Sequence, residues 1–185
     1  MKHLLCIFTL LLCAARPYAQ NHFEKPANGQ PVILLLHPTH TNLQRTAYLL
    51  DHGILPLPQA RFVGVYHSKE HYDYTASHEF IEQETRHNFA LHELTDSIGP
   101  GQVYAPNPLS DDFRQLFQSA SAAVFFGGPD IPPVLYGDSA SLLTNIYDPY
   151  RHYMEISFLA HLLGTSRNAG MPALLEQDSL FAVYG

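Results

Sequence analysis

Blocks of apolar and polar residues alternate along the chain and predict short buried strands separated by helices. Continuous apolar runs suit strands that are covered on both faces of a parallel sheet. Runs of this kind, four to six residues long, lie at 31–36, 61–66, 122–126 and 181–184, and a further short strand is predicted at 89–92.

Amphipathic segments between these runs predict helices. Apolar side chains recur at helical spacing in residues 42–52, 77–86, 111–119 and 150–163. Asp111 or Asp112 is a candidate cap for the third helix, and Gly53 stands where the first should end. The apolar face predicted for the fourth helix comprises Tyr153, Ile156, Leu159, Ala160 and Leu163.

The order of these elements predicts an α/β domain. Residues 31–66 alternate strand, helix and strand, which is the unit that places helices over a parallel sheet. Stretches at 67–75 and 99–108 are polar and aromatic or rich in Gly and Pro, and predict loops. We therefore expect a mainly parallel sheet flanked by helices across residues 31–185.

Residues 1–19 have the pattern of a secretory signal peptide. Their apolar run at 4–15 is shorter than the ~20 residues that a membrane span requires. Cleavage is expected after Ala19, so that the protein is exported, with residues 20–30 as a polar linker to the domain. A lipoprotein anchored at Cys13 is the alternative.

Composition narrows the classes of function. Hydrophobic residues make up 46% and charged residues 15% of the chain, and the formal net charge is −7. A nucleic-acid partner is not expected, because phosphate contacts require clustered Lys and Arg. Both cysteines, Cys6 and Cys13, lie within the predicted signal peptide, so the processed chain has no thiol for a disulfide, a metal site or a nucleophile.

The twelve histidines raise the question of a metal site. His37-x-x-His40 and His67-x-x-x-His71 have spacings that zinc ligands use, and Asp73 or Glu70 could add an oxygen. Both pairs lie in predicted loops, and the pattern fixes no third ligand. We therefore expect hydrogen-bonded or exposed histidines, and neither a metal nor another cofactor.

Other polar clusters are open to structural explanations as well. Tyr66, Tyr72 and Tyr74 could line a substrate mouth or belong to an ordered surface loop. The glutamates of residues 77–86 are expected on a solvated helix face. The sequence contains no Gly-x-Ser-x-Gly elbow, so a conventional serine hydrolase is not expected.

The most informative segment is the end of the apolar run at 122–126, which is followed by Gly127 and Gly128. Open α/β folds place their ligand sites at the carboxyl edge of the sheet. Glycines there present backbone N–H groups without a side chain, and such donors stabilise a developing oxyanion. A tight strand-to-loop turn explains the same glycines without any ligand.

Two motifs carry a resemblance to a known family. Residues 125–137, Phe-Phe-Gly-Gly-Pro-Asp-Ile-Pro-Pro-Val-Leu-Tyr-Gly, resemble the Gly-Gly-x-Asp-(Ile/Val)-x-Pro-x-x-Tyr-Gly signature of the γ-glutamyl-γ-aminobutyrate hydrolase family, within the class I glutamine amidotransferase-like superfamily. Residues 148–155 match the next family element, an Asp before an Arg-(Asp)-x-x-Glu helix, with His152 where many members have Asp. We expect Arg151 and Glu155, one helical turn apart, to form a structural ion pair.

The resemblance covers about residues 31–185 and implies a flavodoxin-like α/β fold, of which these residues are an incomplete part. In the family, a nucleophilic cysteine in a Cys-x-Gly-x-Gln context follows the strand that corresponds to residues 181–184. That cysteine would come just after Gly185, and the histidine base and its acid would come further on.

On this resemblance, the complete protein is expected to hydrolyse a small-molecule γ-glutamyl amide through a thioester. Gly128, helped by Gly127, would donate to the oxyanion, and Asp130 and Tyr136 would lie near the substrate. The 185 residues contain no triad, so we expect them to be inactive alone. A non-catalytic module that binds a small ligand, or the product of a decayed gene, is the alternative.

Overall fold

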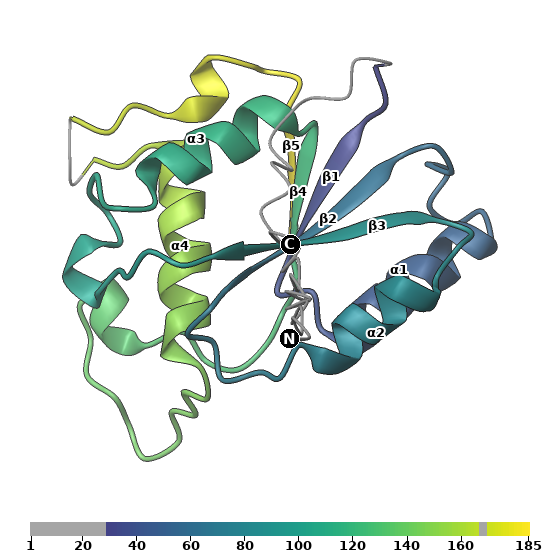
Figure 1. Cartoon of the computed structure of the whole chain (residues 1–185). Helices are drawn as coiled ribbons and strands as arrows, with labels where there is room; N and C mark the ends of the chain where they lie inside the picture. The colour runs from purple at the N-terminus through teal and green to yellow at the C-terminus, as the bar shows by residue number, and fades with distance from the viewer. Residues whose placement is uncertain (1–28, 167–169) are drawn as a thin grey trace, which may run out of the picture.

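A parallel sheet lies between two layers of helices in the computed structural model, which describes residues 29–166 and 170–185 (Figure 1). The strands are β1 (Val32–Leu36), β2 (Arg61–His67), β3 (Asn88–Leu94), β4 (Ala122–Phe125) and β5 (Ala182–Tyr184). The α-helices are α1 (His40–Asp51), α2 (Thr75–Gln83), α3 (Ser110–Ser119) and α4 (Pro149–Leu163). Short 3-10 turns are η1 (Pro100–Gln102), η2 (Pro133–Tyr136) and η3 (Leu174–Glu176). The predicted α/β class is confirmed.

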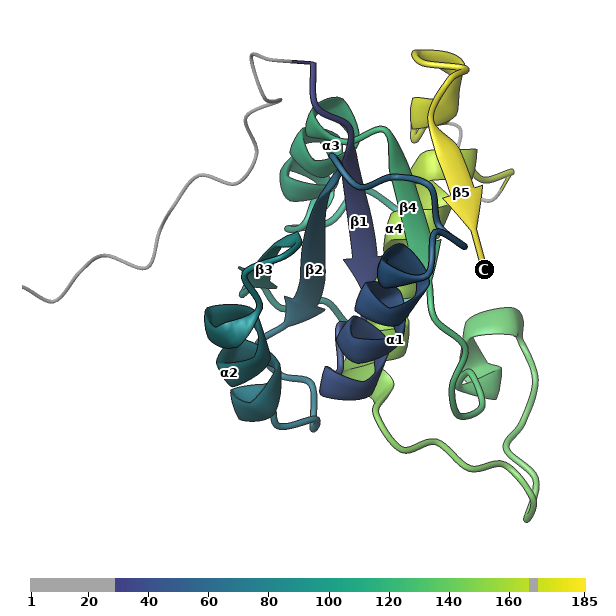
Figure 2. The same cartoon turned by 90° about the vertical axis from the view of Figure 1, so that its right-hand side faces the viewer.

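The strands of the described residues are all parallel and follow the order β3-β2-β1-β4-β5 (Figure 2). Leu36, at the end of β1, pairs with Val65 of β2 on one side and with Phe125 of β4 on the other. The chain builds outward from β1 to β3 and then returns to add β4 and β5 beyond β1. The strand order therefore reverses between β1 and β4, and ligands of open α/β sheets bind at such a point.

Both faces of the sheet are covered, which explains why the strands are continuous apolar runs. Helices α1 and α2 cover one face, where Leu35, Leu43 and Phe62 belong to one core cluster (Figure 1). Helices α3 and α4 cover the other face, where Leu34 and Phe113 belong to a second cluster. Successive residues of β1 point to opposite faces, so the strand contributes to both cores.

The helix ends follow local capping chemistry, with one correction. The Thr39 side chain accepts a hydrogen bond from the N–H of Asn42 at 3.2 Å and so caps α1, while Gly53 ends that helix with a φ of 64°. Asp111 and Asp112 are not caps, as one of them was predicted to be, because α3 begins before them and both lie in its first turn. Carboxylates in a first turn still interact favourably with the helix dipole.

The buried face of α4 differs from the predicted one. Met154, Phe158 and Leu162 are completely buried against the sheet, whereas Leu163 is 58% exposed. Of the residues predicted for this face, Ala160 is the one that is buried. Apolar residues occur nearly all round α4, so their spacing does not single out one face. The sheet-facing side also carries polar side chains, which an apolar pattern cannot reveal.

Helix α2 spans Thr75–Gln83, so it begins and ends earlier than predicted. The helix stops because Glu84 takes an extended backbone and its carboxylate binds the backbone and side chain of Arg86.

The predicted signal peptide and most of the linker at 20–30 lie outside the described residues. Among the helices of residues 29–166 and 170–185, none has the length and apolar character needed to cross a bilayer.

Candidate active site

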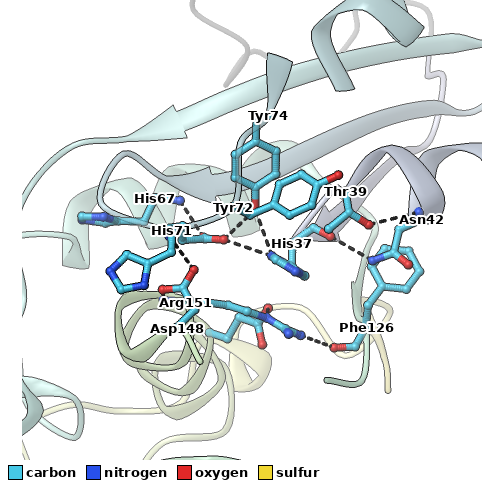
Figure 3. Close-up of polar contacts among 12 residues, drawn as sticks. His37, Thr39, Asn42, His67, His71, Tyr72, Tyr74, Phe126, Asp148 and Arg151 are labelled. Atoms are coloured by element: carbon cyan, nitrogen blue, oxygen red, sulfur yellow. Dashed lines mark hydrogen bonds and ion pairs between the residues drawn. The ribbon is translucent and has the colours of Figure 1, made fainter. Parts of the chain in front are cut away.

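The segments that follow β1 and β4 lie side by side at the carboxyl edge of the sheet. His37 comes directly after Leu36, and Phe126 comes directly after Phe125, the residue that pairs with Leu36. Neighbouring strands are about 4.8 Å apart, so the turn after β1 and the Gly127–Gly128 turn after β4 face each other. Figure 3 shows His37 and Phe126 in this region together with Arg151 of α4.

Arg151 fixes the backbone of the glycine turn. Its Nη2 donates to the carbonyl oxygen of Phe126 at 2.5 Å and to that of Gly127 at 3.5 Å (Figure 3). The peptide bonds are trans, so each carbonyl points away from the N–H of the next residue. The N–H groups of Gly127 and Gly128 therefore face away from the guanidinium. Within residues 29–166 and 170–185, neither N–H donates a hydrogen bond, and both glycines are exposed.

The close approach of Arg151 also explains why residue 128 has no side chain. A Cβ at Gly128 would lie 2.9 Å from Arg151 Cζ and closer still to Nη1, whereas a Cβ at Gly127 would meet nothing within 4 Å. Real Cβ atoms do not come this close to their neighbours. The lack of a side chain at residue 128 therefore makes room for Arg151. The sequence had instead suggested that it makes room for a substrate.

Arg151 and Glu155 lie in contact inside the protein. The Nε of Arg151 donates to Oε1 of Glu155 at 2.9 Å, and their side chains are 4% and 10% exposed. Burial raises the pKa of Glu155 to about 7, although the charge and hydrogen bond of Arg151 act against this rise. The pair joins consecutive turns of α4 and holds the guanidinium where it reaches the glycine turn.

Asp148 connects the start of α4 to the loop between β2 and α2. Its Oδ1 accepts from the N–H of Arg151 at 3.3 Å and caps the helix, and its Oδ2 accepts from the N–H of His71 at 2.7 Å. Asp148 is only 3% exposed. A single carboxylate therefore fixes the helix that carries Arg151 against the segment that follows β2.

Glu70 is the centre of a second polar cluster on the β2 side. Its Oε2 lies 3.0 Å from Nδ1 of His37 and accepts from the hydroxyl of Tyr74 at 2.5 Å, while its Oε1 accepts from the N–H of His67 at 2.8 Å. The Glu70 side chain is completely buried. Burial, followed by the charge of Glu70, strongly raises the pKa of Tyr74, so its hydroxyl stays protonated and donates.

His37 holds a backbone conformation that is uncommon for residues other than glycine. Its φ is 59°, and among the described residues it is the one non-glycine with a positive φ. The left-handed region costs an ordinary residue roughly 1–2 kcal/mol, and such strain is concentrated at functional sites. Its imidazole is 14% exposed, so the ring is partly in contact with solvent.

His152 lies beneath this region with an unsatisfied ring nitrogen. The residue is 4% exposed, and its Nε2 has no hydrogen-bond partner within the described part of the chain. Burial, and then the charge of Arg151, lower its pKa, so the imidazole is neutral near pH 7. A carboxylate at this position would add a negative charge beside Asp148 and Glu70.

Asp130 and Tyr136 lie on the long connection between β4 and α4. Asp130 closes this loop on itself, because its Oδ2 accepts from the N–H of Asn145 at 3.0 Å and its own N–H donates to the carbonyl of Asn145 at 3.2 Å. Tyr136 is 56% exposed in η2. Both residues line a surface cavity of about 370 Å³ within the loop. Leu142 and Leu143 near its tip are almost fully exposed.

The residues weighed for a metal have other partners. Nδ1 of His37 is taken by Glu70 and Tyr74, and His67 Nε2 lies 2.9 Å from the carbonyl of Asp96. No group of three or more His, Cys, Asp or Glu residues within the described ranges is arranged to hold a metal ion.

Tyr66, near the end of β2, and Tyr72 and Tyr74, in the segment that follows it, line a surface cavity of about 270 Å³ together with Glu70. Glu93 lines the same cavity. Sequence reasoning considered Glu70 only as a possible metal ligand and missed its bond to His37. The positions of both residues at strand ends were the signal that could have joined them.

Comparison with known proteins identifies no relative: no family model matches the chain, and neither the curated proteins nor the solved structures contain a match.

Proposed function

We propose that this chain is the oxyanion-binding part of an exported hydrolase that cleaves γ-glutamyl or similar glutamine-like amides through a cysteine thioester. The proposal combines the sequence resemblance with one structural observation: the N–H groups of Gly127 and Gly128 make no hydrogen bond within the described residues, and both glycines are exposed at the point where the strand order reverses. Donors fixed in advance at such a position stabilise the negative oxygen of a tetrahedral intermediate.

Arg151 strengthens these donors in two ways. It holds the two carbonyl groups behind the turn, so the N–H groups keep their direction when the substrate carbonyl becomes an oxyanion. A guanidinium bound to a carbonyl oxygen also polarises that peptide group, which makes the N–H on its other end a better donor. Arg151 is thus a positioning residue that does not touch the substrate.

The position of β5 fits a nucleophile beside this turn. Tyr184 pairs with Val124, and the position of a Cβ at Gly185 lies 3.8 Å from the carbonyl oxygen of Phe125. A residue that continues this strand would therefore emerge next to the glycine turn. The resemblance expects the Cys-x-Gly-x-Gln elbow at this point, where the sulfur would attack an amide carbon whose oxygen is bound by the turn.

The experiment is to read the coding sequence after the Gly185 codon and to express the protein with the residues encoded there. We expect a Cys-x-Gly-x-Gln motif within a few codons, hydrolysis of γ-glutamyl-p-nitroanilide, and loss of at least about 10³-fold in kcat when that cysteine becomes Ala. The Cys→Ser variant is the matched control: mass spectrometry should detect the acyl-enzyme on the wild type and none on this variant.

Two outcomes would overturn the proposal. The absence of a cysteine near this position removes the nucleophile, and a cysteine whose replacement leaves amide hydrolysis unchanged removes its role. Saturable binding of a γ-glutamyl compound without turnover would identify the non-catalytic binding module instead.

Export is a separate part of the proposal and rests on residues 1–19 of the sequence. Expression in a secreting host, followed by N-terminal sequencing of the exported protein, should give Gln20 as the first residue. An unprocessed chain retained in the cytoplasm would contradict it, and a lipid-modified Cys13 would favour the lipoprotein alternative.

A further inference from the structure

His37 and Glu70 form a hydrogen-bonded pair beside the glycine turn, and neither has a role in the cysteine mechanism. We propose that this pair is a second acid–base centre, in which His37 takes a proton from water so that the water attacks an acyl compound bound at the Gly127–Gly128 turn. The inference rests on the proposed function only for the use of this turn as an oxyanion hole.

The hydrogen bonds around Glu70 select one tautomer of His37. The hydroxyl of Tyr74 has one proton and donates it to Glu70, so it can only accept from the histidine. Glu70 also can only accept while it is ionised. Nδ1 of His37, which lies 3.0 Å from Glu70 and 2.9 Å from Tyr74, must therefore carry the proton. Nε2 is left with a lone pair, as a general base requires.

The remaining ring nitrogen, Nε2, is not engaged by any of the described residues. The His37 side chain is partly exposed. In Figure 3, His37 lies between Tyr74 on one side and Arg151 and Phe126 on the other. The carboxylate of Glu70 thus holds one edge of the imidazole, and the strand that leads to the glycine turn pairs with the strand that precedes His37.

The strained backbone supports a functional reason for this orientation. A glycine or asparagine would adopt a φ of 59° more easily than histidine. Thr39 and Asn42 keep this turn in place, because the Asn42 side chain donates to the carbonyl of His37 at 3.0 Å and Thr39 caps the next helix. The fold therefore holds the imidazole at this position at the expense of local stability.

The proposed reaction requires only water and an acyl compound. Nε2 of His37 accepts a proton from water as the water oxygen bonds to the acyl carbon, and the carbonyl oxygen becomes an oxyanion held by the N–H groups of Gly127 and Gly128. The oxyanion then collapses, the bond from the acyl carbon to the leaving group breaks, and the leaving oxygen or nitrogen takes the proton from Nε2. Glu70 remains ionised throughout and stabilises the transient imidazolium.

An activated ester is the substrate class that this centre should turn over, because a phenolate leaves without the covalent help that an amide needs. The experiment measures kcat/KM for p-nitrophenyl acetate between pH 5 and 9. We expect His37→Gln to lower kcat/KM by about 10²-fold, which is a typical contribution of a general base. His52→Gln is the matched control, because His52 is exposed at the far end of α1, and its rate should equal that of the wild type.

Glu70→Gln tests the role of the carboxylate. We expect kcat to fall while KM stays unchanged, because the transient imidazolium loses its negative neighbour and the turn that binds the acyl compound is untouched. A purely structural role for Glu70 would instead disturb this turn and raise KM. If His37→Gln does not fold, His37→Gly decides the question, since glycine accepts the positive φ; added imidazole should then restore ester hydrolysis in a saturable manner.

Equal rates for wild type and His37→Gln, or a His37→Gly variant that imidazole does not rescue, would overturn the acid–base centre. Neither result bears on the cysteine mechanism, which is measured on the amide substrate with the residues encoded after Gly185. The ester is assayed on the 185-residue chain, whose two cysteines lie within residues 1–19, so a failure of the acid–base centre and a failure of the cysteine mechanism are distinguishable.

Discussion

Replacement of Gly128 by Ala tests whether Arg151 is what holds the glycine turn in place. The new Cβ would lie 2.9 Å from Arg151 Cζ, and the guanidinium would have to withdraw to at least 3.4 Å for ordinary contact. The 2.5 Å hydrogen bond to the Phe126 carbonyl does not survive such a movement with good geometry. Because Arg151 is buried and paired with Glu155, it has little room in which to retreat.

The expected loss is that of one hydrogen bond to a charged group, so Gly128→Ala should reduce the free energy of unfolding by about 2 kcal/mol. Gly127→Ala is the matched control and should change it by less than about 0.5 kcal/mol, because its Cβ meets nothing within 4 Å. Urea unfolding followed by circular dichroism measures both. In an Arg151→Met background, Gly127→Ala and Gly128→Ala should reduce the free energy of unfolding by the same amount, because the guanidinium that obstructs the new Cβ is gone. Equal losses for both variants in the wild-type background would refute the reasoning.

Three further changes test other contacts of the site. Burial raises the pKa of Glu155 from 4.5 to about 7, so the native state binds this proton more tightly than the unfolded chain. The free energy of unfolding of the wild type should therefore fall relative to that of Glu155→Gln as pH rises from 4.5 to about 7. Urea unfolding at several pH values measures this difference. His37→Gly should be about 1 kcal/mol more stable than His37→Ala, the reverse of the usual order, because φ is 59°; calorimetry that ranks Ala above Gly would contradict the strain. Asp148→Ala should lower the free energy of unfolding, measured with urea, by about 2 kcal/mol, because the alanine leaves the N–H groups of Arg151 and His71 without an acceptor. Asp148→Asn should lower it by less.

The fold was predictable because its signals are local. Each strand is an apolar run, α1 to α3 are amphipathic segments, and the alternation of strands and helices permits little besides a parallel sheet between helices. Even the short run at 89–92 proved to be a strand, extended to Asn88–Leu94 by its pairing with β2. The errors arose where tertiary contacts outweigh local pattern, as in α4, where completely buried Ser157 and nearly buried Arg151 face inward beside Met154.

The candidate site was predictable only in part. The glycine turn and the Arg151–Glu155 pair lie in continuous motifs, so their sequence spacing contains the geometry. His37 and Glu70 are separated by 33 positions, and their contact depends on β1 and β2 being neighbours in the sheet. The positive φ of His37 was not predictable, because only a few per cent of non-glycine residues adopt one and the residue type alone does not single this position out.

Several features that lower the stability of the protein occur together at one edge of the sheet. Their grouping is an argument for function that does not depend on a family resemblance. A strained histidine, a buried carboxylate on Glu70, a buried Arg151–Glu155 pair and an unsatisfied nitrogen on His152 all occur near the ends of β1, β2 and β4. Apolar side chains at these buried positions would often give a more stable protein. The rest of the sheet shows that the chain forms ordinary apolar packing readily, with two well-filled cores. A sequence that departs from this packing where the strand order reverses is best explained by chemistry at that point.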